Sequence, residues 1–247
     1  VFENLMNAYA RSYDPHSSYF SPRNSEEYRI QMSLNYEGIG ASLQLIDDFV
    51  TVMNVIEGGP AAVAGTLKPT DRIVGVAQGA DGAFTDVIGW RIDDVVQLIR
   101  GKGGTLVRLH VLPGGAAPGA PEKTLAFTRN KVTLEAQAAQ KSLHTLERSG
   151  RSYRIGVISV PGFYQDIAAQ NAGDDDYRST TRDVHRLIDE LRQEKIDGLV
   201  LDLRGNGGGL LREAVNIVNF FVAKNELVVE TKGKIAEWDK PYKTLSE

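Results

Sequence analysis

The sequence contains no cysteine, and this absence removes several kinds of site together. Without cysteine a chain has no disulfide, no thiolate nucleophile and no cysteine-ligated metal. Long hydrophobic runs are also missing, since none approaches the roughly 20 apolar residues that a membrane-spanning helix needs. An excess of positive charge is missing as well: 28 Lys and Arg face 32 Asp and Glu, a net charge of −4. This balance argues against a nucleic-acid binder and leaves the class of globular proteins.

The length and the first residue set further bounds. The 247 residues leave room for one large domain or two ordinary ones. The chain starts at Val1 rather than at a methionine, and it shows no signal peptide. We therefore expect a trimmed chain, in which a missing targeting segment carries no information about location.

What the sequence does contain is a concentration of glycine in one short stretch. Gly205–Gly209 has four glycines among its five residues. The apolar run Leu199–Leu203 before it predicts a strand buried on both faces, as in the middle of a mostly parallel sheet. The pattern after it is helical, with apolar residues at Leu211, Val215, Val218 and Val222. A strand, a glycine turn and a helix start together aim free backbone N–H groups at one point, which suits a negative charge.

Several interpretations of this glycine stretch are possible from the residues alone. A phosphate loop would end in Gly-Lys-Ser/Thr, which does not follow Gly209, and a dinucleotide fingerprint would space its glycines as G-x-G-x-x-G. An oxyanion hole would use the N–H groups to stabilise charge that develops during acyl transfer. A tight turn without a ligand would need the same glycines for backbone geometry alone. The spacing does not decide between these last two.

Short strands alternate with two helices between residues 36 and 131. Alternating runs on either side of Asp47-Asp48 predict a β-hairpin. Apolar residues at i, i+3, i+4 and i+7 predict an amphipathic helix that Gly101 would end. The glycine- and proline-rich run Pro113–Pro121 predicts a mobile hairpin tip. The predicted elements are the strands Ala41–Ile46, Phe49–Val55, Asp71–Val76, Thr105–Leu112 and Thr124–Thr128 and the helices Pro60–Ala64 and Ile92–Ile99.

The last third of the chain has the pattern of an α/β region. A strand is predicted at Tyr153–Val160, and an amphipathic helix begins at Thr180 and ends near Lys195. The chain then returns to the Leu199–Leu203 strand, and strand, helix and strand in this order predict a crossover unit. A further strand at Leu227–Thr231 would begin another hairpin. The fold class is therefore α+β or α/β, with a β-rich domain before an α/β core.

Several of these stretches, in this order, resemble the C-terminal processing peptidases, and among them the bacterial tail-specific proteases. The matching motifs are Asp14–Tyr19, Glu37–Ala41, Gly58–Ala62, Asp71–Val76, Val87–Arg91, Val157–Phe163 and Asp202–Gly209. Members of this family are serine endopeptidases with a Ser/Lys dyad and a PDZ domain that senses the C-terminus of the substrate, and the resemblance to the tail-specific proteases implies a periplasmic location. The resemblance therefore implies three parts: a helix with a linker at 1–35, a PDZ domain at 36–131 and the first part of a protease core at 132–247.

The resemblance also implies roles for individual residues of the glycine stretch. In the parent enzyme, Gly208 would supply one N–H group of the oxyanion hole, while Gly207 and Gly209 would shape the turn. Asp202 and Arg204 have a simpler role available, as an ion pair that holds the turn. No cofactor and no metal is expected for this chemistry.

In the PDZ region, the resemblance implies a binding site for the free C-terminus of a protein substrate. Such domains add the peptide as a strand at a sheet edge and hold its carboxylate in a nest of backbone N–H groups. The glycine loop that would hold the carboxylate, and the candidates to line the pocket for an apolar last side chain, are Gly38, Ile39, Gly40, Ala41, Leu43, Val95 and Val96. Expected partners are protein or peptide substrates and an adaptor protein, with no nucleic acid.

One departure from the family affects catalysis directly. The family's nucleophile lies in a Ser-Ala-Ser-Ala-Ser-Glu stretch and its lysine in a Phe-Gly-Lys-Gly stretch, and neither occurs here. Gly101-Lys102-Gly103 is no substitute, because it precedes the glycine turn at the end of the predicted PDZ helix. We therefore expect this chain alone to be inactive. Two alternatives are a peptide-binding scaffold that has lost catalysis and a nucleotide-binding enzyme that uses the Gly205–Gly209 turn.

Overall fold

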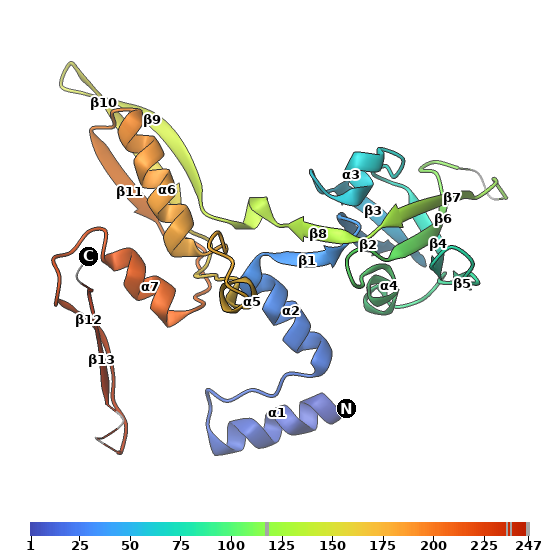
Figure 1. Cartoon of the computed structure of the whole chain (residues 1–247), viewed down its shortest axis with the longest axis horizontal. Coiled ribbons are helices and arrows are strands. Elements are labelled where there is room, and N and C mark those ends of the chain that lie inside the picture. Colours follow the sequence, from blue (N-terminus) through green and yellow to red (C-terminus); the bar gives the residue numbers. More distant parts are fainter. Residues whose placement is uncertain (117–118, 236, 238, 246–247) are drawn as a thin grey trace. The chain divides into compact units, whose positions relative to one another are not determined.

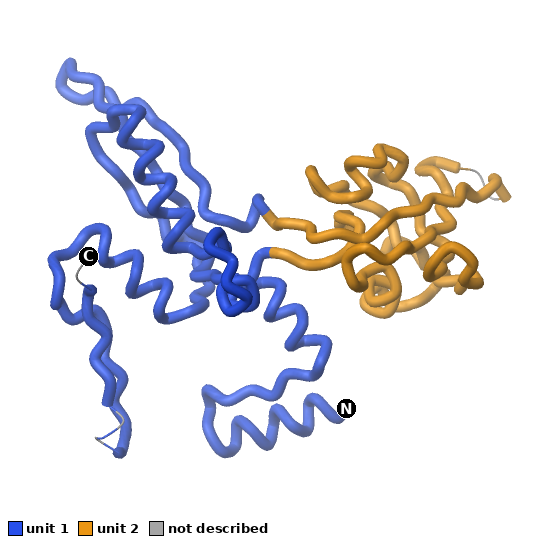
Figure 2. Tube along the Cα trace, in the orientation of Figure 1, with its two compact units in different colours: residues 1–34, 135–247 blue, residues 35–134 orange. Residues whose placement is uncertain are grey.

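A computed structural model of the chain describes residues 1–116, 119–235, 237 and 239–245 (Figure 1). The chain divides into two compact units (Figure 2). Unit 1 contains residues 1–34 and 135–247, and unit 2 contains residues 35–134. Unit 2 is thus inserted into the sequence of unit 1, and each unit has its own hydrophobic core. Within the described ranges, no helix is long and apolar enough to cross a membrane.

Unit 2 is built on a six-stranded antiparallel sheet. Five of its strands follow the order β2-β3-β4-β6-β7, β5 pairs with β4, and β1 pairs separately with β8. The elements are β1 (Asn35–Gly38), β2 (Ala41–Ile46), β3 (Phe49–Val55), α3 (Pro60–Ala64), β4 (Arg72–Gln78), β5 (Thr85–Asp86), α4 (Ile92–Ile99), β6 (Leu106–Leu112), β7 (Lys123–Thr128) and β8 (Asn130–Thr133). All the strands and helices predicted for this region are confirmed, with small shifts at strand ends. Residues 117 and 118 of the predicted hairpin tip lie outside the described residues.

The core of unit 2 follows directly from the alternation in its sequence. In β6, Val107, Leu109 and Val111 are buried while the residues between them are only partly buried, as the pattern predicts. These side chains pack in one cluster with Val95 and Ile99 of α4. Because α4 contributes two buried residues to the sheet's core, its position beside the sheet is fixed by hydrophobic contact.

A buried arginine fixes the C-terminal end of α4. Arg129 is only 3% exposed, and it donates to the carbonyl oxygens of Leu98 (2.9 Å) and Ile99 (2.8 Å). Its guanidinium also reaches the side chains of Gln78 (2.6 Å) and Thr105 (3.0 Å). Burial lowers the pKa of Arg129 from its ordinary value. The last carbonyls of a helix have no partner inside the helix, so Arg129 satisfies them and ties α4 to the neighbouring strands.

Unit 1 combines a three-stranded sheet with helices. Its strand order is β11-β10-β9, with β10 parallel to β11 and antiparallel to β9. The elements are α1 (Phe2–Tyr13), α2 (Pro22–Ser33), the 3-10 helix η1 (Glu135–Gln137), β9 (Gln140–Arg148), β10 (Arg151–Ser159), α5 (Ile167–Asn171), α6 (Thr180–Gln193), β11 (Gly198–Asp202), α7 (Leu211–Val218), β12 (Leu227–Thr231) and β13 (Lys240–Lys243). The predicted helix–strand order β10–α6–β11 and the hairpin that begins with β12 are confirmed.

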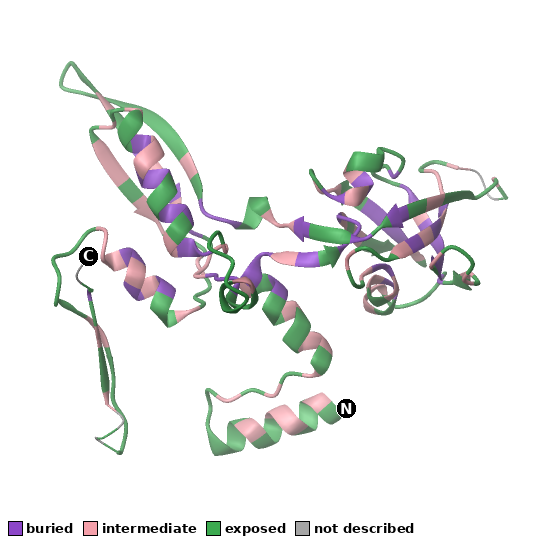
Figure 3. Ribbon diagram, in the orientation of Figure 1, coloured by how far each residue is buried: buried purple, intermediate pink, exposed green. Residues whose placement is uncertain are grey.

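The core of unit 1 lies between α6 and the sheet. One side of α6 carries its buried residues, as Figure 3 shows by the purple bands along the helix. Val184, Leu187, Ile188 and Leu191 pack in one cluster with Ile158 of β10. Ser179 caps the first turn of α6, because its side chain accepts the N–H of Arg182 at 3.3 Å. These contacts hold the helix over the strands that lead to the glycine turn.

Three features of unit 1 differ from the sequence-based expectation. The linker predicted after the first helix contains a second helix, α2, capped by Ser21 and begun by Pro22. The segment before β10 forms a long strand, β9, whose residues are almost all exposed. The strand predicted to be buried on both faces, β11, lies at an edge of the described sheet, and Val200 is 48% exposed. An edge position leaves one side of β11 without a neighbouring strand in the described structure.

A buried polar network ties α6 to the start of β9. The hydroxyl of Tyr164 donates to Asp183 (2.6 Å) and accepts the backbone N–H of Ala139 (2.9 Å). Arg178 donates to Asp183 (3.1 Å) and to both carboxylate oxygens of Glu135. The hydrogen bond from Arg178 lowers the pKa of Glu135, and burial raises the pKa of Tyr164. Every member of this network therefore has a hydrogen-bond partner.

Removing the Tyr164 hydroxyl tests this network. Tyr164→Phe leaves the buried Ala139 N–H without an acceptor and removes one donor from Asp183, so unit 1 should lose about 1–3 kcal/mol of stability. Hydrogen exchange at the Ala139 amide and along α6 measures the loss within unit 1. Tyr13→Phe is the matched control, because Tyr13 is 90% exposed on α1. Equal protection in the two variants would contradict the proposed role of the hydroxyl.

Candidate functional site

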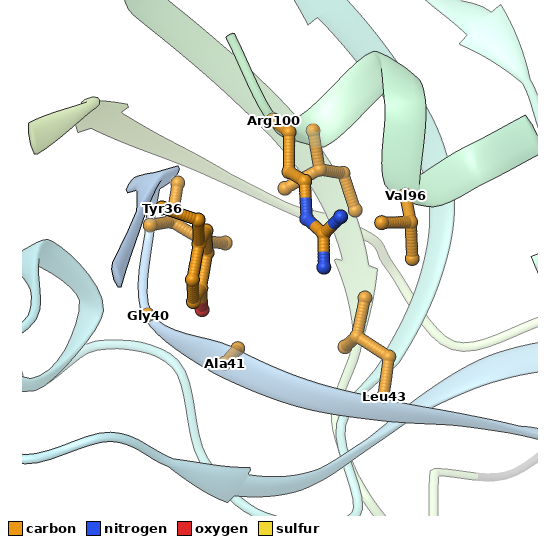
Figure 4. Close-up of a pocket in the computed structure, with 8 residues that line it drawn as sticks. Tyr36, Gly40, Ala41, Leu43, Val96 and Arg100 are labelled. Carbon is orange, nitrogen blue, oxygen red and sulfur yellow. The ribbon is translucent and has the colours of Figure 1, made fainter. Parts of the chain in front are cut away.

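The first candidate site is a cavity in unit 2 between strand β2 and helix α4. Strand β2 lies at one edge of the sheet, so its outer side has no neighbouring strand in the described structure. The cavity has a volume of about 180 Å³ (Figure 4). Its walls come from β1, from the turn before β2, from β2 itself, and from the C-terminal half of α4 with the residue that follows it. The lining residues are Tyr36, Ile39, Gly40, Ala41, Leu43, Val96, Ile99 and Arg100.

Most of the residues predicted for peptide binding lie around this cavity. Ile39, Gly40, Ala41, Leu43 and Val96 line it, whereas Gly38 and Val95 do not. Gly38 ends β1, where it is paired with a residue of β8. Val95 is completely buried in the core of unit 2. Neighbouring helix positions point about 100° apart, which turns Val95 into the core and Val96 toward the groove.

The backbone of the turn before β2 is oriented by two hydrogen bonds. The carbonyl of Ile39 accepts the Ala61 N–H and the carbonyl of Gly40 accepts the Ile56 N–H, both at 2.8 Å. In a planar trans peptide group the N–H points opposite to the C=O. The N–H groups of Gly40 and Ala41 therefore point away from residues 56–61. Gly40 has a φ of +78° and approaches Gly59 closely, so this conformation favours glycine at both positions.

Three lining residues were not foreseen from the sequence. Tyr36 and Arg100 face one another, with the guanidinium carbon 5.0 Å from the ring centroid. Burial raises the pKa of Tyr36, and the charge of Arg100 opposes part of that rise. Figure 4 shows the Arg100 guanidinium directed into the space between Tyr36 and Val96. The third, Ile99, ends α4 and is buried. The cavity thus combines apolar walls with a positive charge and outward-facing N–H groups, which suits an apolar group that carries a carboxylate.

The second candidate site is the glycine turn of unit 1. The turn is anchored by the backbone of Phe163, whose N–H donates to Gly208 (2.9 Å) and whose carbonyl accepts the Leu210 N–H (2.8 Å). A Cβ on Gly209 would lie 2.2 Å from the Phe163 carbonyl oxygen, and Gly209 has a φ of +137°. Only glycine fits there, for both steric and conformational reasons. No such obstacle exists at Gly207, where a Cβ would meet no atom within 4 Å.

The N–H groups of the turn differ in their partners. The predicted oxyanion donor, Gly208, donates its N–H to the side-chain oxygen of Asn206 at 2.7 Å. Asn206 is itself held, because its amide donates to the Val160 carbonyl at 2.9 Å. Asparagine commonly bonds the backbone two residues further on in this way. Across the part of the chain that the structure describes, the N–H groups of Gly207 and Gly209 have no hydrogen-bond acceptor.

The predicted ion pair at the start of the turn is present. Arg204 donates to both carboxylate oxygens of Asp202, with the closest contact at 2.7 Å, and its backbone N–H donates as well at 3.0 Å. The side-chain hydrogen bond from Arg204, followed by the backbone one, lowers the pKa of Asp202 to about 2. The carboxylate is therefore charged at every ordinary pH, and the pair joins the end of β11 to the turn.

A cavity of about 510 Å³ lies beside the glycine turn in unit 1. Its size falls within the usual range for ligand sites. The lining residues come from α2 and the residue after it, from η1, from the chain after β10 and from the turn: Tyr28, Gln31, Met32, Leu34, Ala136, Gln137, Pro161, Gly162, Phe163, Tyr164, Gly207, Gly208 and Gly209. The described residues contain no group of His, Cys, Asp and Glu side chains that could hold a metal ion.

Comparisons with protein families match three consecutive parts of the chain. The model "Peptidase family S41" matches residues 154–246, "PDZ domain" matches 27–112 and "Tail specific protease N-terminal domain" matches 1–23. Among curated proteins, the Haemophilus influenzae tail-specific protease is 39% identical over 228 residues, which is 92% of this chain and 30% of the relative. The Bacillus subtilis carboxy-terminal processing protease CtpA is 28% identical over 221 residues, 90% of this chain and 40% of the relative.

Two solved structures are also similar. The PDZ domain of a carboxy-terminal protease from Vibrio cholerae, solved in complex with a peptide, is 46% identical, with 41% of this chain and 100% of that chain covered and a TM-score of 0.39. The photosystem II D1 C-terminal processing protease is 25% identical, with coverages of 97% and 58% and a TM-score of 0.41. The chain spans less than half the length of the curated relatives described above. The three family matches occur in one order along one chain, so the chain contains a region of peptidase family S41 and a PDZ domain.

Proposed function

We propose that this chain belongs to a serine endopeptidase in which unit 2 recognises the free, apolar C-terminus of a protein substrate. The observation that carries the proposal is the cavity between the edge strand β2 and helix α4, with Ile39 and Gly40 of the turn before β2 at its end. The match of residues 154–246 to peptidase family S41 supports a hydrolytic function over a scaffold that has lost catalysis. The serine and lysine of the catalytic dyad would come from sequence outside these 247 residues.

Peptide binding in unit 2 would use the backbone of β2 and the turn before it. The peptide would add as a further strand to the free edge of β2, as in other strand-addition complexes. Its terminal carboxylate would accept hydrogen bonds from the N–H groups of Gly40 and Ala41. The positive charge of Arg100 would attract the carboxylate. Its last side chain would enter the cavity between Leu43 and Val96. The small volume of the cavity and its apolar walls favour an uncharged last residue.

Catalysis in the whole protein would use the glycine turn as a source of N–H donors. The nucleophilic serine would lose its proton to a lysine held in a poorly solvated position. The oxyanion would then accept hydrogen bonds from the N–H groups of Gly207 and Gly209, which have no acceptor among the described residues. Participation of Gly208 requires Asn206 to release its N–H. A periplasmic location and an adaptor protein are also expected for such an enzyme, and both stay predictions.

Peptides that differ only at their last residue test the recognition site on this chain as it stands. A peptide with a free apolar C-terminus should bind, and amidation of the same peptide should weaken binding by about tenfold or more, because charge-assisted hydrogen bonds to the carboxylate are lost. A peptide that ends in Asp should bind weakly too, since its side chain would bury an unpaired charge. Fluorescence polarisation measures all three. Equal affinities would show that the turn before β2 is no carboxylate site.

A pair of valine variants locates the pocket within unit 2. Val96→Asp places a charge in the wall of the cavity and should reduce affinity for the apolar C-terminus by about tenfold or more. Val63→Asp is the matched control, because Val63 is 81% exposed on α3 and lies outside this cavity. Titration with the same labelled peptide compares the two. Weaker binding in both variants, or in neither, would contradict the placement of the pocket.

Two alanine variants separate the geometry of the glycine turn from its donors. Gly209→Ala should break the pairing with Phe163, because its Cβ would overlap the Phe163 carbonyl, and the Leu210 amide should then exchange faster. Gly207→Ala meets no atom and should keep that protection. Hydrogen exchange on this chain measures both. In the full-length enzyme, Gly209→Ala should lower kcat by about a hundredfold or more if the turn positions the oxyanion donors.

The chain alone should not hydrolyse peptides, because the family's serine and lysine stretches are absent from it. An unfolded protein with an apolar C-terminus, incubated with the purified chain, should show no cleavage above buffer. Cleavage that survives stringent purification and disappears when a serine of this chain is replaced would overturn the assignment of the dyad to sequence outside it.

A further inference from the structure

We propose that helix α2 is a substrate-binding element of the catalytic region. In this inference, which rests on the proposed function, Tyr28, Gln31 and Met32 form one wall of a subsite that receives an apolar side chain beside the bond to be cleaved. The opposite wall is the glycine turn, since both sets of residues line the same cavity of about 510 Å³. Helix α2 belongs to a region that the sequence predicts as a linker, so no motif points to this role.

A short segment fixes the distance between α2 and the glycine turn. Phe163 pairs through its backbone with Gly208 and Leu210. Two residues later, the Gln165 N–H donates to the carbonyl of Met32, near the end of α2, at 2.8 Å. One three-residue stretch is therefore hydrogen-bonded to both walls of the cavity. A site whose two walls are hydrogen-bonded to one backbone segment keeps its geometry better than a site built on loops alone.

Helix α2 is also anchored at its start. Its N-cap, Ser21, accepts the N–H of Asn24, and the Asn24 side chain donates to Glu3 of α1. The ring of Tyr28 packs against Phe20 in the preceding segment, with centroids 5.4 Å apart. Yet Tyr28 keeps 44% of its surface exposed. An aromatic side chain that is held on one side and open toward a cavity is well placed to contact a ligand.

The chemistry of the lining residues indicates which side chain the cavity receives. None of the described residues that line it is charged. An aromatic ring, a thioether, Pro161 and Phe163 supply apolar surface, and Gln31 supplies an amide. An apolar substrate side chain gains from burial there. An Asp or Glu side chain would be buried without a counter-charge, which is costly. The occupant is a side chain next to the scissile bond, because Gly207 and Gly209, whose N–H groups have no acceptor among the described residues, line the same cavity.

A charge placed on α2 tests this inference in the full-length enzyme. The substrates share one C-terminal sequence, so that unit 2 recognises all of them alike. They form two pairs: one pair has Leu or Asp directly before the scissile bond, and the other has Leu or Asp directly after it. The wild type should favour Leu over Asp in kcat/KM by about tenfold or more on one side. Tyr28→Lys places a cation in the cavity wall and should reduce that preference about tenfold. Tyr28→Phe, which keeps the ring, should retain it.

Tyr13→Lys is the matched control, because Tyr13 is 90% exposed on α1 and does not line the cavity. It should keep the wild-type preference. An unchanged preference in Tyr28→Lys on both sides of the bond would overturn the subsite while leaving the protease assignment intact. A wild-type enzyme that cleaves none of these substrates would instead contradict the proposed function. A lower kcat/KM for Leu and Asp substrates in equal proportion would show that Tyr28 has only a structural role.

Discussion

The close approach of the Phe163 backbone to Gly209 is the constraint on which the candidate catalytic region depends. The carbonyl of Phe163 occupies the space that a side chain at position 209 would need. Its two backbone hydrogen bonds then hold the glycine turn open at the end of β11. The same segment is hydrogen-bonded to the carbonyl of Met32 through Gln165. The approach of Phe163 to Gly209 therefore helps to set the shape of the cavity beside the turn. The glycines are therefore required first for backbone packing, and their availability as donors follows from it.

In unit 2 the geometry of the cavity depends on a side chain, Arg129, rather than on a glycine. Its cavity needs α4 to stay beside β2, an edge strand whose outer side has no neighbouring strand among the described residues. Arg129 achieves this by binding the carbonyls of Leu98 and Ile99, at the end of the helix that carries Val96. The cost of burying its charge is offset by several hydrogen bonds, as is usual for buried charged groups. The wall that α4 gives to the cavity is thus held by contacts within unit 2.

The fold of unit 2 was predictable because its signals are local. Alternation along β6, the turn at Asp47-Asp48 and the helical spacing of α4 each act within a few residues. In unit 1, α2 buries only Ile30 and Ser33, so its apolar periodicity is weak, and only the Ser21-Pro22 start signal was available. Strand β9 is almost wholly exposed and has no alternation to reveal it. Its register is imposed by its partner strand β10 rather than by its own sequence.

The candidate sites divide in the same way between local and non-local information. Gly40, Leu43 and Val96 could be proposed from the sequence, because the family resemblance implies the site and the local patterns of a turn, a strand and an amphipathic helix place these residues in it. The face of α4 that lines the cavity could not be identified until the packing of the helix against the sheet was known. The same packing places Arg100 opposite Tyr36. At the glycine turn, the engagement of Gly208 by Asn206 is local and follows from the habit of asparagine in turns. The wall formed by α2 could not be predicted from local sequence. Tyr28 and Gly207 are brought to one cavity by backbone pairing between segments more than a hundred residues apart.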